Sequence, residues 1–343
     1  MQILVTGCAG FIGSHFVEQM LQKHPTWQIT NLDLLTYAGF AHTSQTLSQN
    51  FPERYRFVHG SVCDSALVDQ LVAEHSHIVH FAAESNVDLS IVDSQAFLQT
   101  NILGTHHLLE ACRRHQSQRI LVISTDEVYG NAWQDRPSTE DDPLLPCSPY
   151  AASKAAQDLL AFSYFETYGL PVLRSRCSNN YGPRQDPTKL IPRFLLHAMH
   201  DQSLPLYGHG GNTRDWVHVQ DHVNALETIL FSPAEHDGQV FNIGTGDEKS
   251  AREVAEFLLQ TLDKPLNLLQ SVPDRLGHVK RHAVNSERLR QHLNWQAAIQ
   301  WEQGLTDTIQ WYQQNADWWR KAIEDQAARI PNYDQNYPFR DWI

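Results

Sequence analysis

The chain is poor in cysteine and in basic residues, and it contains no long hydrophobic run. Its five cysteines are widely spaced among 343 residues, which matches neither a disulfide framework nor a zinc site. No apolar stretch approaches the roughly 18 residues that cross a bilayer, and the opening MQILVTG has no signal-peptide pattern. We therefore expect a cytoplasmic protein without a membrane segment. The 19 histidines show no convincing metal-ligand spacing, so no metal is predicted.

The scarcity of basic residues excludes one class of partner. Lysine and arginine number 26 against 39 aspartates and glutamates, a formal net charge of −13. A nucleic acid would be repelled, because affinity for a phosphate backbone rests on clustered Lys and Arg. A small anion is not excluded, since a helix N-terminus or a few placed arginines act at short range. The apolar share of 41% is typical of a soluble globular protein.

The first half of the chain alternates short β-branched runs with amphipathic stretches. The runs are continuously apolar, which is typical of strands in a parallel sheet covered by helices on both faces. The predicted strands are 2–6, 28–33, 56–59, 78–81, 119–124 and 171–176, and the predicted helices are 11–23, 66–74, 93–115 and 149–167. This order predicts a doubly wound α/β fold, followed by a loop-rich part with dense Gly, Pro and Asn.

A glycine loop joins the first predicted strand to the first helix. Gly7, Gly10 and Gly13 have the spacing G-x-x-G-x-x-G, which allows a tight turn and close approach of a pyrophosphate to a helix N-terminus. Asp33 ends the second strand, where a carboxylate can accept both ribose hydroxyls of NAD and would repel the 2′-phosphate of NADP. A plain turn capped by Asp33 is the alternative. The strand, loop and helix together favour NAD.

A tyrosine and a lysine share one face of the helix predicted at 149–167. Tyr150 and Lys154 are four residues apart. Lowering the pKa of a tyrosine from about 10 to about 7 requires about 4 kcal/mol. The Lys154 ammonium and a cationic nicotinamide could supply this stabilisation. The spacing alone is common in helices, but here it follows a nucleotide-binding half-fold.

Two adjacent acids follow the fifth predicted strand. Asp126 and Glu127 stand where parallel strands end at the ligand crevice. Two carboxyl groups in a closed cleft tend to separate in pKa, leaving one protonated as an acid and one ionised as a base. A solvated acidic turn is the alternative. An epimerase needs no such pair, so the pair indicates elimination chemistry.

Seven motifs then resemble a known family. In chain order they are TGCAGFIG, HFAAES, STDEVYG, YAASK, NNYGP, KLIP and RDW, and with flanking matches they extend to about residue 282. They resemble the extended short-chain dehydrogenase/reductases, and among these the 4,6-dehydratases of the NAD-dependent epimerase/dehydratase family. The resemblance implies a Rossmann-type doubly wound parallel sheet with a smaller mixed α/β C-terminal substrate-binding domain. It also implies a homodimer formed through helices 93–115 and 149–167.

The resemblance implies a lyase with an internal redox cycle. Tyr150, helped by Thr125 and Lys154, would take the proton of the sugar 4-hydroxyl while a hydride passes from C4 to NAD. Glu127 would then remove the C5 proton, Asp126 would protonate the departing 6-hydroxyl, and the hydride would return to C6. The product would be a nucleotide-linked 4-keto-6-deoxy sugar. We expect dTDP-glucose as the substrate, with a UDP- or CDP-linked hexose as the alternative.

The same resemblance carries over two sets of binding residues. The expected cofactor set is Gly7, Gly10, Phe11, Ile12, Gly13, Asp33, Ser61, Val62, Ala82, Ala83, Thr100, Tyr150, Lys154 and Asn180. The expected nucleotide-sugar set is Ser85, Thr125, Asn179, Lys189, Leu190, Pro205, Tyr207, Arg214, Arg275 and His278. Residues 1–177 would form the NAD-binding domain, with a segment near 215–245 returning to it. Residues 178–330 would mainly bind substrate, and 331–343 would form a tail.

Five positions depart from the family pattern: Ser61, Asn86, Leu89, Ala251 and His282. The family typically has Asp, His, Arg, Asn and Tyr there. All the expected catalytic residues are kept. The departures therefore leave open which nucleotide or sugar is bound, and they do not change the expected reaction. Two further readings are a 4-epimerase and a non-catalytic NAD-binding sensor. The sensor would be expected to lose the tyrosine or the lysine, and this chain has both.

Overall fold

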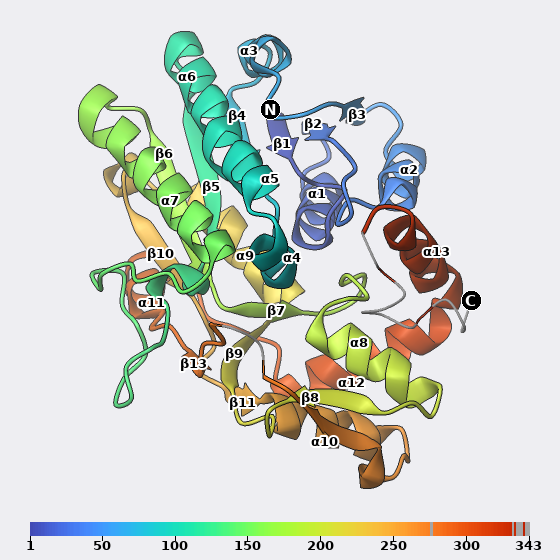
Figure 1. The fold of residues 1–343 in the computed structure, drawn as a ribbon. Coiled ribbons are helices and arrows are strands. Elements are labelled where there is room, and N and C mark those ends of the chain that lie inside the picture. Colours follow the sequence, from blue (N-terminus) through green and yellow to red (C-terminus); the bar gives the residue numbers. More distant parts are fainter. Residues whose placement is uncertain (275–276, 331–332, 334–338, 340–343) are drawn as a thin grey trace.

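A seven-stranded parallel sheet forms the centre of the protein. The computed structural model describes residues 1–274, 277–330, 333 and 339 (Figure 1). The strand order is β10-β6-β5-β4-β1-β2-β3, which confirms the predicted doubly wound parallel sheet. The strands are β1 Gln2–Thr6, β2 Gln28–Asp33, β3 Tyr55–His59, β4 His77–His80, β5 Arg119–Thr125, β6 Val172–Cys177 and β10 Val240–Ile243. Each predicted strand matches an observed one within one residue at either end.

Helices cover both faces of this sheet because neighbouring strand residues point in opposite directions. Ile3 and Val5 pack in a core cluster with Phe16, whereas Leu4 packs in another with Leu108. The first cluster is supplied by α1 Phe11–Lys23 and α9 Val219–Leu230, and the second by α3 Ser65–Ala73, α6 Thr105–His115 and α7 Pro149–Tyr168. Two further helices, α2 Ala41–Asn50 and α4 Val87–Val92, were not predicted.

The single helix predicted at 93–115 is wrong. The segment consists of α5 Gln95–Phe97, a π-helical stretch η1 Leu98–Gly104, and α6. Asp93 ends α4 instead, and its carboxylate accepts from the backbone N–H of Gln95 at the start of α5. A Cβ at Gly104 would lie 2.5 Å from Val62 Cγ2, so close contact with the loop after β3 accompanies the widened turn.

A second group of short strands and helices lies below the carboxyl edge of the sheet in Figure 1. Its strands are β7 Asn179–Tyr181, β8 Leu204–Tyr207, β9 Thr213–His218, β11 Glu248–Ser250, β12 Leu269–Val272 and β13 Arg281–His282. Its helices are α8 Leu190–Met199, α10 Ala251–Thr261, α11 Glu287–Leu293, α12 Trp301–Gln314 and α13 Ala316–Ala327. Most of the apolar side chains of α8, α10, α12 and α13 share one core cluster.

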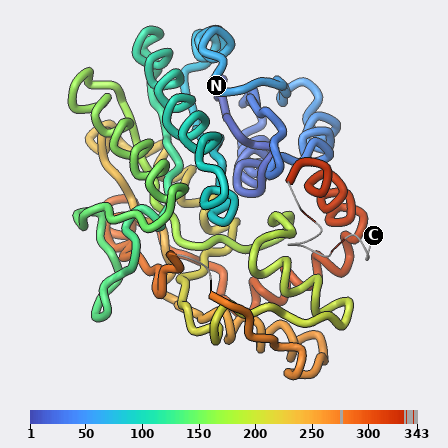
Figure 2. The backbone as a smooth tube through the Cα atoms, in the orientation of Figure 1, coloured from blue at the N-terminus to red at the C-terminus, as the bar shows by residue number. Residues whose placement is uncertain are grey.

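The chain crosses back to the large sheet between these elements. Strand β10 pairs in parallel with β6, and α9 packs in the same cluster as α1. Figure 2 shows this return, with the segment near residue 240 beside the green strand β6. Of the predicted tail 331–343, only Tyr333 and Phe339 lie within the described residues, and both are buried in the cluster of α8, α10, α12 and α13.

The last helix, α13, braces the loop that follows β2. Trp318 packs edge-on against Phe40, with ring centroids 5.3 Å apart. Just after α13, Arg329 donates to the backbone oxygens of Thr36 and Gly39, each at 3.0 Å. In Figure 1 α13 accordingly lies beside α2. No helix in the described ranges is long and apolar enough to cross a membrane.

Candidate active site

One large cavity opens at the carboxyl ends of the central strands. Its volume is about 480 Å³. The cavity is lined by every residue of the expected cofactor, catalytic and nucleotide-sugar sets except Arg275, which lies outside the described residues. Residues far apart in sequence, from Gly7 to His278, thus meet around one space. Among the described residues, no group of three or more His, Cys, Asp or Glu is arranged to hold a metal ion.

The glycine loop forms a cradle whose backbone shape requires glycine at two of its positions. Gly7 has a φ of +77°, and a Cβ there would lie 2.5 Å from the backbone nitrogen of Ala82. A Cβ at Gly13 would lie 2.7 Å from Cys8 Cα. Gly10 caps the N-terminus of α1 without a side chain. The exposed backbone N–H groups and the helix dipole therefore fit a diphosphate, the linking group of a dinucleotide.

Asp33 holds the turn after β2, as in the alternative that the sequence left open, and it also faces the cavity. Its two carboxylate oxygens accept from the backbone N–H groups of Ala9 and Leu35, each at 2.8 Å. The side chain therefore ties the turn after β2 to the glycine loop, and it also lines the cavity. Burial raises the pKa of Asp33 above its ordinary value, and the two backbone N–H donors oppose that rise.

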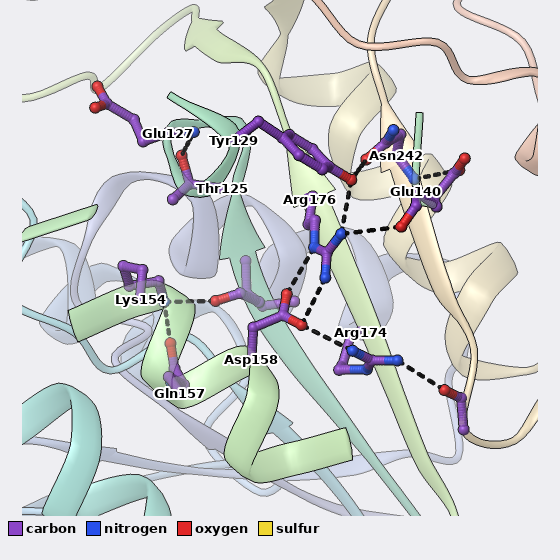
Figure 3. A network of polar contacts seen from close by, with 12 residues as sticks. Thr125, Glu127, Tyr129, Glu140, Lys154, Gln157, Asp158, Arg174, Arg176 and Asn242 are labelled. Carbon is purple, nitrogen blue, oxygen red and sulfur yellow. Dashed lines mark hydrogen bonds and ion pairs between the residues drawn. The ribbon is translucent and has the colours of Figure 1, made fainter. Parts of the chain in front are cut away.

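Tyr150 and Lys154 project from α7, which begins at Pro149 behind the capping hydroxyl of Ser148. Burial raises the pKa of Tyr150 well above its ordinary value, Glu127 raises it further, and a hydrogen bond with Thr125 opposes the rise. We expected Lys154 to lower the pKa of Tyr150, and this effect is not found here. The lysine ammonium instead donates to the backbone oxygen of Ile123 at 2.6 Å and to Gln157 (Figure 3). Burial lowers the pKa of Lys154 to about 7.

The two adjacent acids lie on a 3-10 turn, η2 Asp126–Tyr129, directly after β5. Asp126 is buried, and burial followed by the charge of Glu127 raises its pKa to about 8. Arg214 and a hydrogen bond with Ser178 oppose this rise. The side chain of Glu127 is more open, with 17% of its surface exposed. Asp126 is thus protonated at neutral pH, in the direction expected of a general acid.

A buried ionic network anchors this turn. Asp158 on α7 accepts hydrogen bonds from Arg174 and Arg176 on β6, at 2.8 to 2.9 Å. Arg176 also donates to the hydroxyl of Tyr129 at 2.7 Å, and that hydroxyl donates to Asn242 on β10 (Figure 3). The network therefore connects η2 to the catalytic helix and to two strands of the sheet.

The part of the cavity around Ser85 is held by hydrogen bonds between loops. Tyr37 accepts from the backbone N–H groups of Ser85 and Asn86, and Lys189 donates to the backbone oxygen of Ser85 at 3.1 Å. The departure Asn86 caps α4, where its side chain accepts from the backbone N–H of Leu89. The family typically has histidine at this position, and the asparagine of this chain therefore has a local structural role.

The far end of the cavity combines an arginine with an aromatic pair. Arg214 on β9 donates to the backbone oxygen of Val279 at 3.0 Å. The rings of Tyr207 and His278 meet edge-on, with centroids 5.9 Å apart. Ala251, another departure, lines the cavity at the first residue of α10. The departure Ser61 also lines it, and its hydroxyl accepts from the backbone N–H of Cys63.

Several lining residues were missed by sequence reasoning. Glu84 is buried beside the hydroxyl of Tyr37, and His222 on α9 lies 2.8 Å from the side-chain oxygen of Asn180. Asp186, Arg193 and Asn212 also line the cavity. Glu84 could have been predicted as a lining residue, because it lies within the HFAAES motif after β4. The others reach the cavity from separate loops and helices, so no spacing in the chain marks them.

A Rossmann sheet with a glycine cradle and a Tyr-x-x-x-Lys pair at its carboxyl edge defines an extended short-chain dehydrogenase/reductase. The profile of the family described as GDP-mannose 4,6 dehydratase matches residues 4–308, and the chain belongs to this family.

Relatives of this chain are similar to it in sequence over nearly their whole length. A dTDP-glucose 4,6-dehydratase of Streptomyces niveus is 44% identical over 340 residues, covering 96% of this chain and 98% of the relative. The crystal structure of a dTDP-glucose 4,6-dehydratase of Streptomyces venezuelae with NAD bound has a TM-score of 0.89 and 41% identity, covering 94% of this chain and 100% of that one. A Bacillus anthracis dTDP-glucose 4,6-dehydratase in complex with NAD has a TM-score of 0.87 and 42% identity, with coverages of 94% and 99%.

Proposed function

We propose that this protein is an NAD-dependent nucleotide-sugar 4,6-dehydratase, and that it converts dTDP-glucose to the 4-keto-6-deoxy sugar with loss of water. One observation carries the proposal: a buried protonated acid, Asp126, and a more open carboxylate, Glu127, flank the same cavity as Tyr150. Oxidation at C4 alone needs the tyrosine, whereas elimination needs an acid and a base as well. The relatives with this activity support the assignment.

The cradle of Gly7, Gly10 and Gly13 fits the diphosphate of NAD, and Asp33 lies where its ribose would bind. When bound, NAD supplies the hydride acceptor for C4 and later the hydride donor for C6. Tyr150 removes the proton of the 4-hydroxyl during oxidation, with Thr125 hydrogen-bonded to its phenol. Burial favours the neutral phenol. Tyr150 therefore has to release its own proton to solvent before it can accept that of the 4-hydroxyl, and the positive charge of bound NAD would favour this release.

The 4-ketone then acidifies the hydrogen on C5. Glu127 accepts that proton, and the electron pair of the C5–H bond forms the C5–C6 double bond as the C6–O bond breaks. Asp126 gives its proton to the leaving oxygen, which departs as water. Return of the hydride to C6 and protonation of C5 complete the product, so the net change is the loss of one water.

The binding residues and the domain division are part of the same proposal. The sets named from the family resemblance hold NAD and the nucleotide sugar, with Tyr207 placed to stack on a base and Arg214 placed to pair with a phosphate. Residues 1–177 with the segment near 215–245 form the cofactor domain, supported by the pairing of β10 with β6. Residues 178–330 mainly form the substrate domain. The five free thiols suit the reducing cytoplasm.

We also propose a homodimer. Large apolar side chains are exposed on neighbouring helical segments, Leu98 and Leu103 on η1 and Leu159, Phe162 and Tyr168 on α7. The two segments pack side by side. A second copy of the chain would cover this apolar face through the same helices, as a symmetric interface allows.

A substrate panel tests the proposal. The protein is incubated with the dTDP, UDP, CDP and GDP derivatives of glucose, and the product is followed by mass spectrometry. The expected result is loss of one water from dTDP-glucose at the highest kcat/KM. Turnover restricted to another base corrects the nucleotide, whereas inversion at C4 without loss of water contradicts the proposal. Nucleotide released on denaturation identifies the bound cofactor.

A further inference from the structure

His282 is a buried histidine in contact with one of the two adjacent acids. Only 1% of its side chain is exposed, and its Nδ1 lies 3.9 Å from Oε1 of Glu127. The residue is on β13 and lies outside the lining of the cavity. It therefore contacts the proposed base from the protein interior and not from the cavity.

The backbone on both sides of His282 is fixed. Strand β13 runs parallel to β9, which places His282 beside Arg214. The backbone oxygens of Arg281 and Ala283 accept from Ala132 and Ser138, each at 2.9 Å. Both donors belong to the loop between η2 and α7. The imidazole is thus held at a set position relative to η2, where Glu127 is located.

The guanidinium of Arg281 adds a second fastening. It pairs with Glu248 on β11 at 2.6 Å and donates to the backbone oxygen of Arg136 at 3.0 Å. The strand that carries His282 is therefore tied to two neighbouring segments by charge as well as by backbone bonds.

The position of the Glu127 carboxylate matters to more than one group. Its negative charge raises the pKa of both Asp126 and Tyr150. A carboxylate that swings freely toward solvent would remove this influence and would present a variable distance to the C5 hydrogen. The imidazole of His282, with its Nδ1 3.9 Å from Oε1 of Glu127, limits the orientations that this carboxylate can adopt.

We propose that His282 is a positioning residue that orients Glu127 for proton removal at C5. The inference rests on the proposed function of Glu127 as the base. It assigns a role to one of the departures from the family pattern, in which an imidazole occupies the position of a phenol.

Three variants of His282 test this role. His282→Phe keeps a ring but removes both nitrogens. His282→Asn places an amide nitrogen near the position of Nδ1, whereas His282→Gln places it near Nε2. The matched control is His236→Phe, because His236 is also buried and its Nε2 lies 3.9 Å from the carboxylate of Glu235, while neither residue lines the cavity. Each protein is used with its NAD bound, and its thermal unfolding is recorded.

Two steps are measured in single turnovers. Oxidation at C4 is followed by the absorbance of the reduced nicotinamide, and proton removal at C5 by incorporation of deuterium from heavy water, read by mass spectrometry. His282→Phe should slow deuterium incorporation by on the order of 10-fold to 100-fold and leave oxidation nearly unchanged. His282→Asn should recover most of the exchange, and His282→Gln less. His236→Phe should leave both steps unchanged.

The outcomes separate the inference from the proposal on which it rests. An equal slowing of both steps in His282→Phe, or equal exchange in the Asn and Gln variants, overturns the positioning role. If His282→Phe does not fold, the Asn and Gln comparison decides. Glu127→Gln should abolish exchange; if it does not, the role of Glu127 itself is wrong. Loss of exchange in Glu127→Gln with normal exchange in His282→Phe refutes the positioning role alone.

Discussion

Asp126 and Glu127 are consecutive in the chain, yet their carboxyl groups lie in different surroundings. Asp126 is 3% exposed, while the side chain of Glu127 is 17% exposed and contacts His282. One turn of 3-10 helix directs the first inward and the second toward the open part of the cavity. Burial keeps a proton on Asp126, with a pKa of about 8, and thereby separates the acid from the base.

The rate of water loss should fall as the pH rises through about 8, because Asp126 must carry a proton to release the 6-hydroxyl as water. Its pKa is raised on folding from 3.8, so the stability that this group contributes is fully present below 3.8 and is lost as the pH rises through about 8. Asp126→Asn should lose elimination and also this part of the pH dependence of unfolding. Paired pH profiles of product formation and thermal unfolding check the prediction; a flat rate from pH 7 to 10 contradicts it.

Tyr150→Phe should block oxidation at C4, by on the order of 100-fold or more, because no other group is proposed to take the hydroxyl proton. Appearance of reduced nicotinamide on mixing with dTDP-glucose is the measurement. Tyr164→Phe is the control, since Tyr164 is buried on the same helix but bonds to Glu110 away from the cavity. Normal oxidation in Tyr150→Phe would remove the tyrosine from the mechanism.

Asp158→Asn should lower the free energy of unfolding by about 3–5 kcal/mol, because it leaves two buried arginines without their carboxylate. Arg174 and Arg176 are 5% and 4% exposed. The exposed pair of Asp69 and Arg114 supplies the control, and Asp69→Asn should lower the free energy of unfolding far less, because solvent screens this pair. Urea denaturation at neutral pH distinguishes the two. Similar costs would mean that the buried network does not support η2.

Leu103→Asp and Leu159→Asp should each convert the dimer into monomers, because a charge would be buried in the proposed interface. Leu266→Asp is the control, as Leu266 is similarly exposed but lies outside η1 and α7. Sedimentation equilibrium gives the mass in each case. A wild-type chain that sediments as a monomer at micromolar concentration would refute the dimer.

The large sheet was predictable because its strands contain short runs of apolar and β-branched residues and its turns carry glycine or aspartate. Helix α2 was not, because only Thr43, Ser44 and Leu47 of its residues are buried and the segment carries no apolar stripe. The π-helical stretch ends at Gly104, which approaches Val62 closely in the folded chain. Local patterns cannot contain such a contact.

The catalytic residues were predictable for a similar reason. Asp126, Glu127, Tyr150 and Lys154 lie in two short motifs next to regular elements, so their location follows from the fold. The residues that contact them could not be located in this way. The bond of Lys154 to the backbone of Ile123 and the contact of His282 with Glu127 join segments that the sequence leaves unrelated.

The hydrogen bonds between the end of α13 and the loop after β2 join two segments that are synthesised at different times. Thr36 and Gly39 receive their hydrogen bonds from Arg329, 293 and 290 residues later. During synthesis the N-terminal part emerges first, so the glycine cradle and Asp33 leave the ribosome long before their support exists. The loop after β2 therefore gains these hydrogen bonds only after residue 329 has been synthesised.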